Sequence, residues 1–121
     1  MARKHRISVK RVYDEPAKAD GTRVLVDRIW PRGARKDEAR IDEWLKDVAP
    51  STELRKWFGH SPERWDAFRE KYAAELEQNG DALRRLLDLC RNGDVTLVYS
   101  ARDEAHNNAV ALKALLEKKL R

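Results

Sequence analysis

The sequence predicts an α/β domain: a small, mostly parallel sheet of three to four strands covered by helices, forming one three-layer-like unit over residues 1–121. Two short runs, RVLV at 23–26 and VTLV at 95–98, are continuously apolar or β-branched after their first positions, which indicates strands buried on both faces. Helical patterns separate these strands, and the last strand leads directly into a helix. This order is typical of a parallel sheet with covering helices.

The composition limits the class of protein. With 41% apolar and 39% charged residues, the chain is too apolar for a disordered segment and too charged for a membrane protein, so we expect no membrane partner. The net charge of +5 favours anionic partners only weakly. Because most charges alternate in sign along helical stretches, a solvated surface is favoured over a nucleic-acid surface.

The only cysteine is Cys90, so no intramolecular disulfide forms and a reducing cytoplasm is the natural location. Its place among leucines predicts a core residue rather than a nucleophile. The N-terminal stretch MARKHRISVK lacks the apolar run of a signal peptide. No paired cysteines, HExxH or nucleotide-binding glycine loops occur, so we expect neither a metal nor a cofactor.

The N-terminal half contains two predicted strands and one predicted helix. Near-alternation over Ile7 to Val12 predicts the first strand, and its direction relative to the second is left open. RVLVDRIW at 23–30 predicts the second strand, which PRG ends. Apolar residues at helical spacing predict a helix within residues 34–48, with Asp37 as its cap and Trp44 on its buried face.

The remaining elements are mostly helical. Ser51 predicts the N-cap of a short helix through Phe58, and Ser61 with Pro62 predicts the start of a longer helix up to Asn79. Asp81 is the expected cap of the next helix, which ends at Asn92–Gly93. VTLVYS forms the third clear strand, and the last helix is expected to begin near Asp103 or Glu104.

Two polar segments follow the two buried strands. Ligands of open α/β sheets usually bind outside the carboxyl ends of the strands. If the strands are parallel, DRIWPRG (27–33) and YSARDEAHNN (99–108) open onto the same edge. The residues that would then converge are Asp27, Arg28, Trp30, Arg32, Tyr99, Ser100, Arg102, His106, Asn107 and Asn108.

These side chains indicate anion binding, and each also has a simpler structural role. The N–H groups at a helix start attract negative charge, and arginines clamp carboxylates or phosphates. Asp27 and His106 have the chemistry of acid–base groups, although Asp27 at a strand end more often pairs with a neighbour. Trp30 equally fits corner packing, and Arg102 equally fits a solvated position. His60 is ranked below His106, with a loop-fixing role favoured.

Three segments resemble the family called domain of unknown function 488, in its YeaO-like branch. They are RVLVDRIWPRG, IDEWLKDVAPSTELRKWFGHSPERWDAFREKYAAEL and VTLVYSARDEAHNNAVAL, and the resemblance covers about residues 5 to 118. It implies an α/β fold in a bacterial, usually cytoplasmic protein, and no particular reaction. Broader members look as though they carry a cysteine after the last strand and a Cys-His-Arg triplet in the next helix. These positions fall here on Tyr99 and on Asn107 to Ala109, so both cysteines are absent.

The leading functional expectation is therefore a small cytoplasmic α/β protein that binds a small anionic ligand in a crevice at the carboxyl ends of the strands. Two alternatives stay open. One is a nucleic-acid or protein interaction module, suggested by the +5 charge. The other is an enzyme, a hydrolase or transferase, with His106 or Asp27 as acid–base group. The oligomeric state and the identity of the ligand are not predicted.

Overall fold

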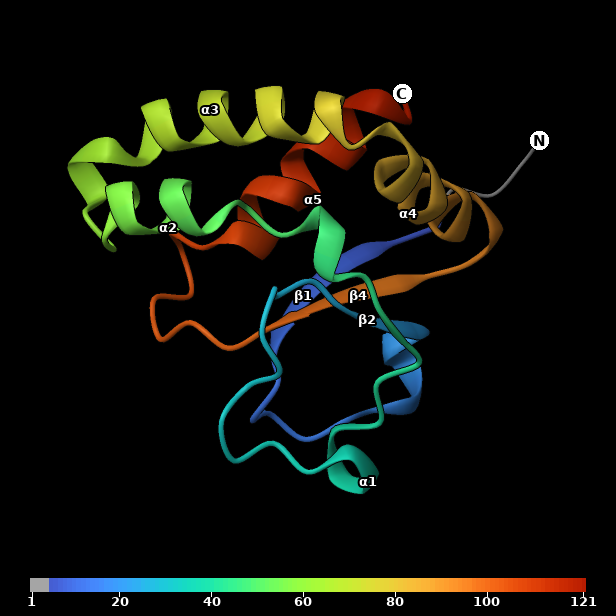
Figure 1. Ribbon diagram of the computed structural model, residues 1–121. Coiled ribbons are helices and arrows are strands. Elements are labelled where there is room, and N and C mark those ends of the chain that lie inside the picture. Colours follow the sequence, from blue (N-terminus) through green and yellow to red (C-terminus); the bar gives the residue numbers. More distant parts are fainter. Residues whose placement is uncertain (1–4) are drawn as a thin grey trace.

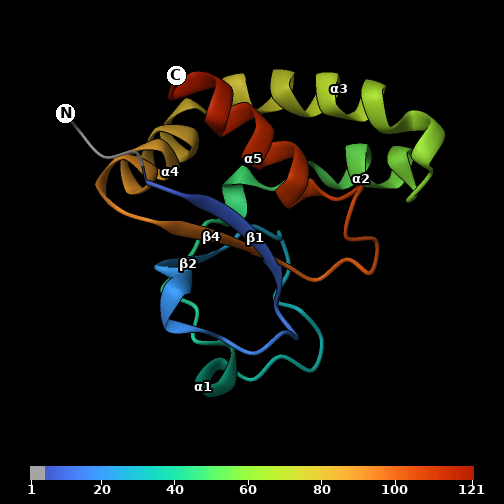
Figure 2. The ribbon, with the colours of Figure 1, turned by 180° about the vertical axis from the view of Figure 1, so that it is seen from behind.

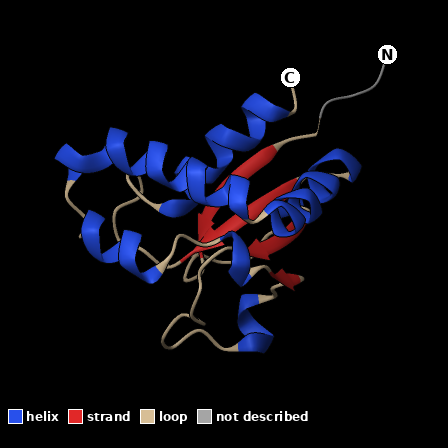
Figure 3. Ribbon diagram, turned by 45° about the horizontal axis from the view of Figure 1, so that its top comes forward, coloured by secondary structure: helices blue, strands red, loops and turns tan. Residues whose placement is uncertain are grey.

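The structure, a computed structural model, describes residues 5–121. Residues 1–4, which begin the stretch predicted to lack a signal peptide, lie outside the described residues. The sheet has four strands, β1 (Ile7–Arg11), β2 (Thr22–Leu25), β3 (Glu43–Trp44) and β4 (Val95–Tyr99), in the order β1-β4-β2-β3. All three strand pairs are parallel (Figure 3). The predicted small parallel sheet of an α/β domain is thereby confirmed.

Helices make up most of the rest of residues 5–121. The α-helices are α1 (Lys36–Ala39), α2 (Thr52–Phe58), α3 (Trp65–Gln78), α4 (Gly80–Asn92) and α5 (Asn108–Lys119). Short 3-10 helices occupy Lys18–Asp20, Lys46–Val48 and Pro62–Arg64. The longer helices α2 to α5 gather on one side of the sheet, whereas α1 lies on the other (Figures 1 and 2).

The main core lies between the sheet and the α2–α5 layer. Alternate residues of the central strands point into it, including Val24 and Val26 of the β2 region and Leu97 of β4. They pack on the inner faces of the helices, where Phe68, Tyr72, Leu86, Leu112 and Leu116 are at most 2% exposed. Cys90 belongs to this core and is 4% exposed, in agreement with its predicted core position. Burial raises the pKa of the Cys90 thiol to about 11.

The opposite face of the sheet has a much smaller core. Leu25 and Val98 pack there with Val12 and Ala39, and Trp30 covers them in part. Since both faces of β2 and β4 are covered, their continuous apolar runs are explained. The third layer consists of α1, a 3-10 helix and loops rather than long helices (Figures 1 and 2).

The helix predicted within residues 34–48 is wrong. The segment contains only the four-residue α1, the strand β3 and a 3-10 helix. Val24 and Leu25 pair with Glu43 and Trp44, and the Leu45 N–H donates to the Leu25 carbonyl at 3.0 Å, so pairing with β2 has replaced helical hydrogen bonds. Asp37 lies inside α1 rather than at its cap, and Trp44 is 38% exposed rather than buried.

Three predicted boundaries also move. The second strand ends at Leu25, and the Val26 N–H still donates to Val98, but residues 27–30 leave the sheet. The last helix begins at Asn108 because Asp103 Oδ1 accepts the N–H groups of Ala105 and His106 and turns the chain. The fourth helix begins at Gly80, so Asp81 lies in its first turn and Asn79 is its N-cap.

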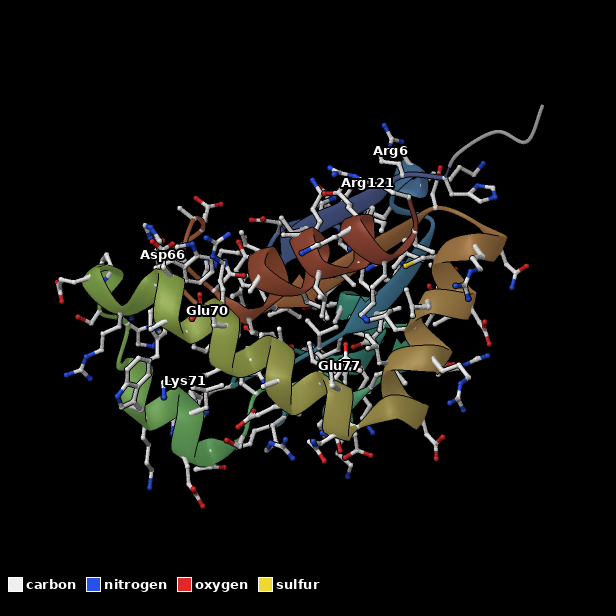
Figure 4. All side chains as sticks on the ribbon, turned by 90° about the horizontal axis from the view of Figure 1, so that it is seen from above. Arg6, Asp66, Glu70, Lys71, Glu77 and Arg121 are labelled. Atoms are coloured by element: carbon white, nitrogen blue, oxygen red, sulfur yellow. The ribbon has the colours of Figure 1, made fainter. Side chains whose placement is uncertain are left out.

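Two predicted helix starts and the outer surface agree with the sequence patterns. The Leu54 N–H donates to Ser51 Oγ at 3.0 Å. Ser61 and Pro62 begin the 3-10 helix that precedes α3, as predicted, but the Ser61 side chain makes no capping hydrogen bond. Figure 4 looks onto the helical layer, where Asp66, Glu70, Lys71 and Glu77 lie along α3. In residues 5–121, no helix combines the length and apolar character needed to cross a membrane.

Candidate functional site

The parallel pairing of β2 with β4 brings the two polar segments to the same edge of the sheet, as expected. A cavity of about 400 Å³ opens there, between these segments and α2. Its lining residues are Asp27, Arg28, Ile29, Trp30, Pro31, Arg32, Ala49, Pro50, Thr52, Arg55, Phe58, His60, Phe68, Ser100, Ala101, His106, Asn107 and Asn108. Eight of the ten residues expected to converge at this edge thus line one cavity, and the two exceptions are Tyr99 and Arg102.

Asp27 joins the two segments through its carboxylate. Oδ2 accepts hydrogen bonds from the Ser100 N–H at 3.0 Å and from the Ser100 hydroxyl at 2.7 Å. Oδ1 accepts one from the Asn108 amide at 3.2 Å, and the same amide donates to the Val26 carbonyl at 2.9 Å. The cluster Asp27–Ser100–Asn108 therefore connects the end of β2, the end of β4 and the first residue of α5.

The surroundings of Asp27 make its charged form less favourable than it is in water. Burial raises the pKa of this carboxyl above its usual value, although the hydrogen bonds from Ser100 and Asn108 and the charge of Arg55 oppose the rise. All three hydrogen-bond donors are neutral groups. The charge of Asp27 is thus solvated by dipoles but not paired with a cation in direct contact.

The cavity has more cations than carboxylates. Arg28, Arg32 and Arg55 line it, whereas Asp27 is the one carboxylate among its lining residues. The half-buried Arg28 donates Nε–H to the Pro50 carbonyl at 3.3 Å and Nη2–H to the Ala49 carbonyl at 3.2 Å. Across residues 5–121, none of these three arginines forms a salt bridge with a protein carboxylate. Their charges remain available to an anion.

Aromatic side chains form an apolar wall of the cavity. Phe58 of α2 and Phe68 of α3 stack with ring centroids 4.5 Å apart, and both line the cavity. Trp65 stacks on Phe68 with ring centroids 5.7 Å apart, and it meets the His106 ring edge-on with centroids 5.3 Å apart. His60, which has a positive φ of 56°, also lies at this wall, 6.3 Å from the Phe58 ring.

The loop before α5 differs from the helix start that the sequence predicted. Asp103 binds the His106 ring at 3.0 Å in addition to the two N–H groups, and these hydrogen bonds hold the pKa of Asp103 below its usual value. The N–H groups of Ala105 and His106 are therefore already bonded within the loop. Arg102 is exposed and outside the cavity, whereas Tyr99 is 2% exposed and belongs to the core. Neither lies where a ligand in the cavity would touch it.

The DRIWPRG segment builds one wall of the cavity and fixes its own shape. The Trp30 indole N–H donates to the Ala34 carbonyl at 2.7 Å, and its ring packs edge-on against Trp44 at 5.6 Å. The Trp44 indole donates to the Asp27 carbonyl at 2.7 Å, and the Tyr13 hydroxyl donates to the Arg32 carbonyl at 2.8 Å. The tryptophan thus has the corner-packing role, while Asp27 and Arg28 are held toward the cavity.

Sequence reasoning did not assign Thr52, Arg55 or Phe58 to the site. All three come from α2, which lies over the carboxyl end of the sheet without being adjacent to it in sequence. No local signal identifies them, because the rule that places ligands at strand ends says nothing about a covering helix. Asn108 was expected to converge on this edge, and its hydrogen bonds to Asp27 and Val26 give it a positioning role there.

The positions that the resemblance matches to the first cysteine and to the Cys-His-Arg triplet have structural roles here. Tyr99 is buried, and Asn107 is 3% exposed and caps α5 by accepting the Val110 N–H at 2.9 Å. Ala109 is fully buried. His106 contacts Asp103 rather than Ser100, so no chain of base and nucleophile forms. Within residues 5–121, no cluster of three His, Cys, Asp or Glu side chains is placed to hold a metal ion.

Comparisons with known proteins give a family and several uncharacterised bacterial relatives. The family described as the inactive DUF488-N3 subclade matches residues 6–121. An uncharacterized protein of Mycobacterium tuberculosis is 48% identical over 116 residues, which cover 96% of this chain and 98% of that protein. The uncharacterized protein YeaO of Escherichia coli is 46% identical over 106 residues, covering 88% of this chain and 92% of YeaO. No solved structure matches the chain.

Proposed function

We propose that this chain, which belongs to the inactive DUF488-N3 subclade, binds a small anionic ligand in the cavity at the carboxyl ends of β2 and β4. The observation that carries the proposal is the set of three lining arginines, Arg28, Arg32 and Arg55, opposed by the single lining carboxylate of Asp27. A guanidinium without a protein carboxylate partner is a strong donor for a carboxylate or phosphate oxygen.

The backbone adds to this preference for negative charge. The twelve-residue α5 directs its N-terminus at the cavity, where Asn107 and Asn108 are lining residues. A helix start carries about half a positive elementary charge, which attracts an anion within the first turn. Arg28 is already held in place by two carbonyl groups, so little side-chain entropy remains to be lost when it binds a ligand.

Three observations favour binding over catalysis. The cysteines of the resembling family are absent, the Asp27 carboxylate is engaged by three hydrogen bonds, and His106 is oriented by Asp103. The description of the family as inactive agrees with this reading. We place this binding function in the cytoplasm, since a reducing compartment suits a chain with one unpaired, buried cysteine.

The test is a titration of the protein with phosphate, sulfate and acetate at constant ionic strength, followed by amide chemical shifts in NMR spectra. The expected result is saturable shifts at Thr52 to Arg55 and at Ser100 and Asn108. The substitution Arg55→Gln should weaken this binding by about tenfold, because one charge-assisted hydrogen bond to the anion is lost.

The matched control is Arg102→Gln, which removes an arginine that lies outside the cavity and should leave the affinity unchanged. Two results would overturn the proposal. One is the absence of saturable shifts with all three anions. The other is an equal loss of affinity in both variants, which would indicate a nonspecific effect of net charge.

A further inference from the structure

The two edges of the sheet differ in length, and β1 forms the longer one. This five-residue strand ends the order β1-β4-β2-β3 and pairs with β4 alone, whereas β3 at the opposite edge has two residues. In Figure 2 β1 is the strand nearest the viewer. We infer that the free edge of β1 is a docking site for an extended acidic segment of a partner protein, which adds a fifth strand to the sheet.

The hydrogen bonds to β4 show which backbone groups of β1 face outward. The Val95 N–H donates to the Arg6 carbonyl at 3.0 Å, and the Val12 N–H donates to the Tyr99 carbonyl at 2.7 Å. Along a parallel pair, every second residue bonds to the neighbouring strand. With the register of β1 on β4, the bonding residues are therefore 6, 8, 10 and 12. The N–H and carbonyl groups of residues 7, 9 and 11 point away from β4.

Most of these outward groups are unpaired. In the part of the chain that the structure describes, no group bonds the outward N–H and carbonyl of Ile7 or Val9, whereas the Arg11 carbonyl accepts the Asp14 N–H at 3.1 Å. The last four residues of β1 are partly exposed, in contrast to the fully buried β4. Only another extended polypeptide offers donors and acceptors that repeat at the matching interval, roughly 7 Å for two residues. The partner is therefore a strand and not a nucleic acid.

The cationic side chains of β1 do not cover this edge. Lys10 Nζ donates to Asp20 at 2.9 and 3.1 Å, and Arg11 Nε–H donates to the Ala101 carbonyl at 3.0 Å. Asp20 precedes β2 and Ala101 follows β4, so both side chains are directed toward the inner strands of the sheet. Proteins often block an exposed edge with a lysine or another charged side chain, and here the two candidates for that role are held elsewhere.

The charge of the edge selects an acidic partner. The segment from Arg6 to Val12 contains three cations and no acidic residue. Asp20 offsets Lys10, but across residues 5–121 neither Arg6 nor Arg11 forms a salt bridge. A second copy of β1 paired at this edge would place the same cations opposite one another, which is unfavourable. An acidic strand places opposite charges there instead.

The two faces of the edge indicate an alternating partner sequence. Val9 packs against the main core on the same face as the buried Ile7, whereas Ser8 and Lys10 lie on the other face. An apolar side chain opposite Val9 extends the core, and an acidic one suits the face of Lys10. In an antiparallel pair, residues that exchange hydrogen bonds share a face. The apolar residues of the partner are therefore those whose N–H groups bond to β1.

The experiment titrates the complete chain with a capped hexapeptide of sequence Glu-Val-Glu-Val-Glu-Val and follows amide NMR signals. We expect saturable shifts along β1 and amide exchange at Ile7 and Val9 slowed about tenfold at saturation. A Lys-Val-Lys-Val-Lys-Val peptide should bind about tenfold more weakly. Methylation of the three valine nitrogens should abolish binding, because it removes the bonding N–H groups. Methylation of the three glutamate nitrogens should change the affinity less than about twofold.

Variants of the protein locate the contact. Val9→Pro removes an outward N–H that the sheet does not use, so the fold should tolerate it while peptide affinity falls about tenfold. Val9→Thr keeps the N–H and the branched shape and should bind like the wild type. Arg6→Gln should weaken binding about threefold, and the control Arg84→Gln on α4 should not. If Val9→Pro does not fold, the methylated peptides on the wild-type chain decide the question.

Four results would overturn the inference. One is the absence of shifts and of slowed exchange at Ile7 and Val9. Another is equal affinity for the lysine peptide, which contradicts the acidic partner. A third is a concentration-dependent dimer in sedimentation that Val9→Pro abolishes, since the edge then pairs with a second copy. The fourth is peptide shifts confined to residues 52–55, 100 and 108, which would mean that the peptide carboxylates bind in the cavity. That result leaves the proposed function standing.

Discussion

Two aspartates lie at opposite ends of β2, and they differ in the charge of their hydrogen-bond partners. Asp20, just before β2, is 8% exposed and accepts hydrogen bonds from Lys10 at 2.9 and 3.1 Å and from Arg23 at 2.6 Å. Asp27, just after β2, is half-buried and accepts hydrogen bonds from the neutral groups of Ser100 and Asn108. One carboxylate is paired with cations, and the other is not.

The pKa values follow this difference. Although burial pushes the pKa of Asp20 upward, the hydrogen bonds from Lys10, Ala17 and Arg23 outweigh it and hold the pKa below its usual value. For Asp27, burial dominates and the pKa is raised. At the amino end of β2, the carboxylate of Asp20 is thus paired with two cations. At the carboxyl end, the carboxylate of Asp27 lies beside a cavity and has no cation in direct contact. A carboxyl group with a raised pKa beside a cavity is typical of functional sites.

The largest expected effect tests whether the Asp20 cluster is structural. Arg23 is 3% exposed and also donates to the Ala39 carbonyl at 2.8 and 3.1 Å, so Arg23→Met leaves a buried carboxylate and a buried carbonyl without this partner. We expect the free energy of unfolding in urea to fall by about 3 kcal/mol. The control Arg84→Met breaks an exposed ion pair with Asp81 and should cost about 0.5 kcal/mol or less. Equal losses in the two variants would contradict the structural role.

The next prediction uses pH to separate the two aspartates. Because the pKa of Asp27 is raised in the fold, its contribution to stability is complete below the unfolded value of 3.8 and is lost as the pH rises through the raised pKa. Because the pKa of Asp20 is lowered, its contribution is present above 3.8 and is lost as the pH falls through the lowered pKa.

The measurement is urea unfolding of the wild type, Asp20→Asn and Asp27→Asn from about pH 3 to pH 6. The stability of the wild type relative to Asp20→Asn should rise with pH, and relative to Asp27→Asn it should fall. Each unit of pKa shift corresponds to about 1.4 kcal/mol. Two difference curves of the same slope would show that the aspartates do not differ in the way the structure indicates.

The smallest expected effect concerns the Ser100 hydroxyl. Ser100→Ala removes its 2.7 Å hydrogen bond to Asp27 and keeps the backbone one, so we expect a loss of about 1 kcal/mol in unfolding free energy near neutral pH and a further rise of the Asp27 pKa. The control is Ser61→Ala, whose hydroxyl bonds the exposed Glu63 and should change stability by less than about 0.5 kcal/mol. A loss no greater than in the control would mean that this hydroxyl does not bind Asp27 in solution.

The elements that the sequence predicted best are those that depend on residues close together in the chain. RVLV and VTLV are unambiguous because both faces of β2 and β4 are covered. Ser51 was correctly predicted as an N-cap because a cap acts through its own neighbouring N–H groups. The region 34–48 was misread because Ile41, Trp44, Leu45 and Val48 fall at helical spacing, and only the distant β2 makes Glu43–Trp44 a strand.

For the site, the sequence could identify side chains at the ends of strands but not those contributed by other elements. Asp27, Ser100 and His106 were found because each lies in or at the edge of a segment following a buried strand. Arg102 also lies in the segment that follows a buried strand, yet the turn formed by Asp103 leaves it exposed and outside the cavity. Arg55 was missed because its place depends on how α2 packs over the sheet.

By itself, the sequence determined the α/β class, the two buried strands and the family, since these depend on periodicity and on residues close together in the chain. The tertiary structure alone decided the parallel β2–β4 pairing, the hydrogen bonds that Ser100 and Asn108 donate to Asp27, and the closing of the cavity by Arg55 and Phe58 of α2. These contacts join residues tens of positions apart. Their geometry comes from the packing of whole helices on the sheet, which no local pattern encodes.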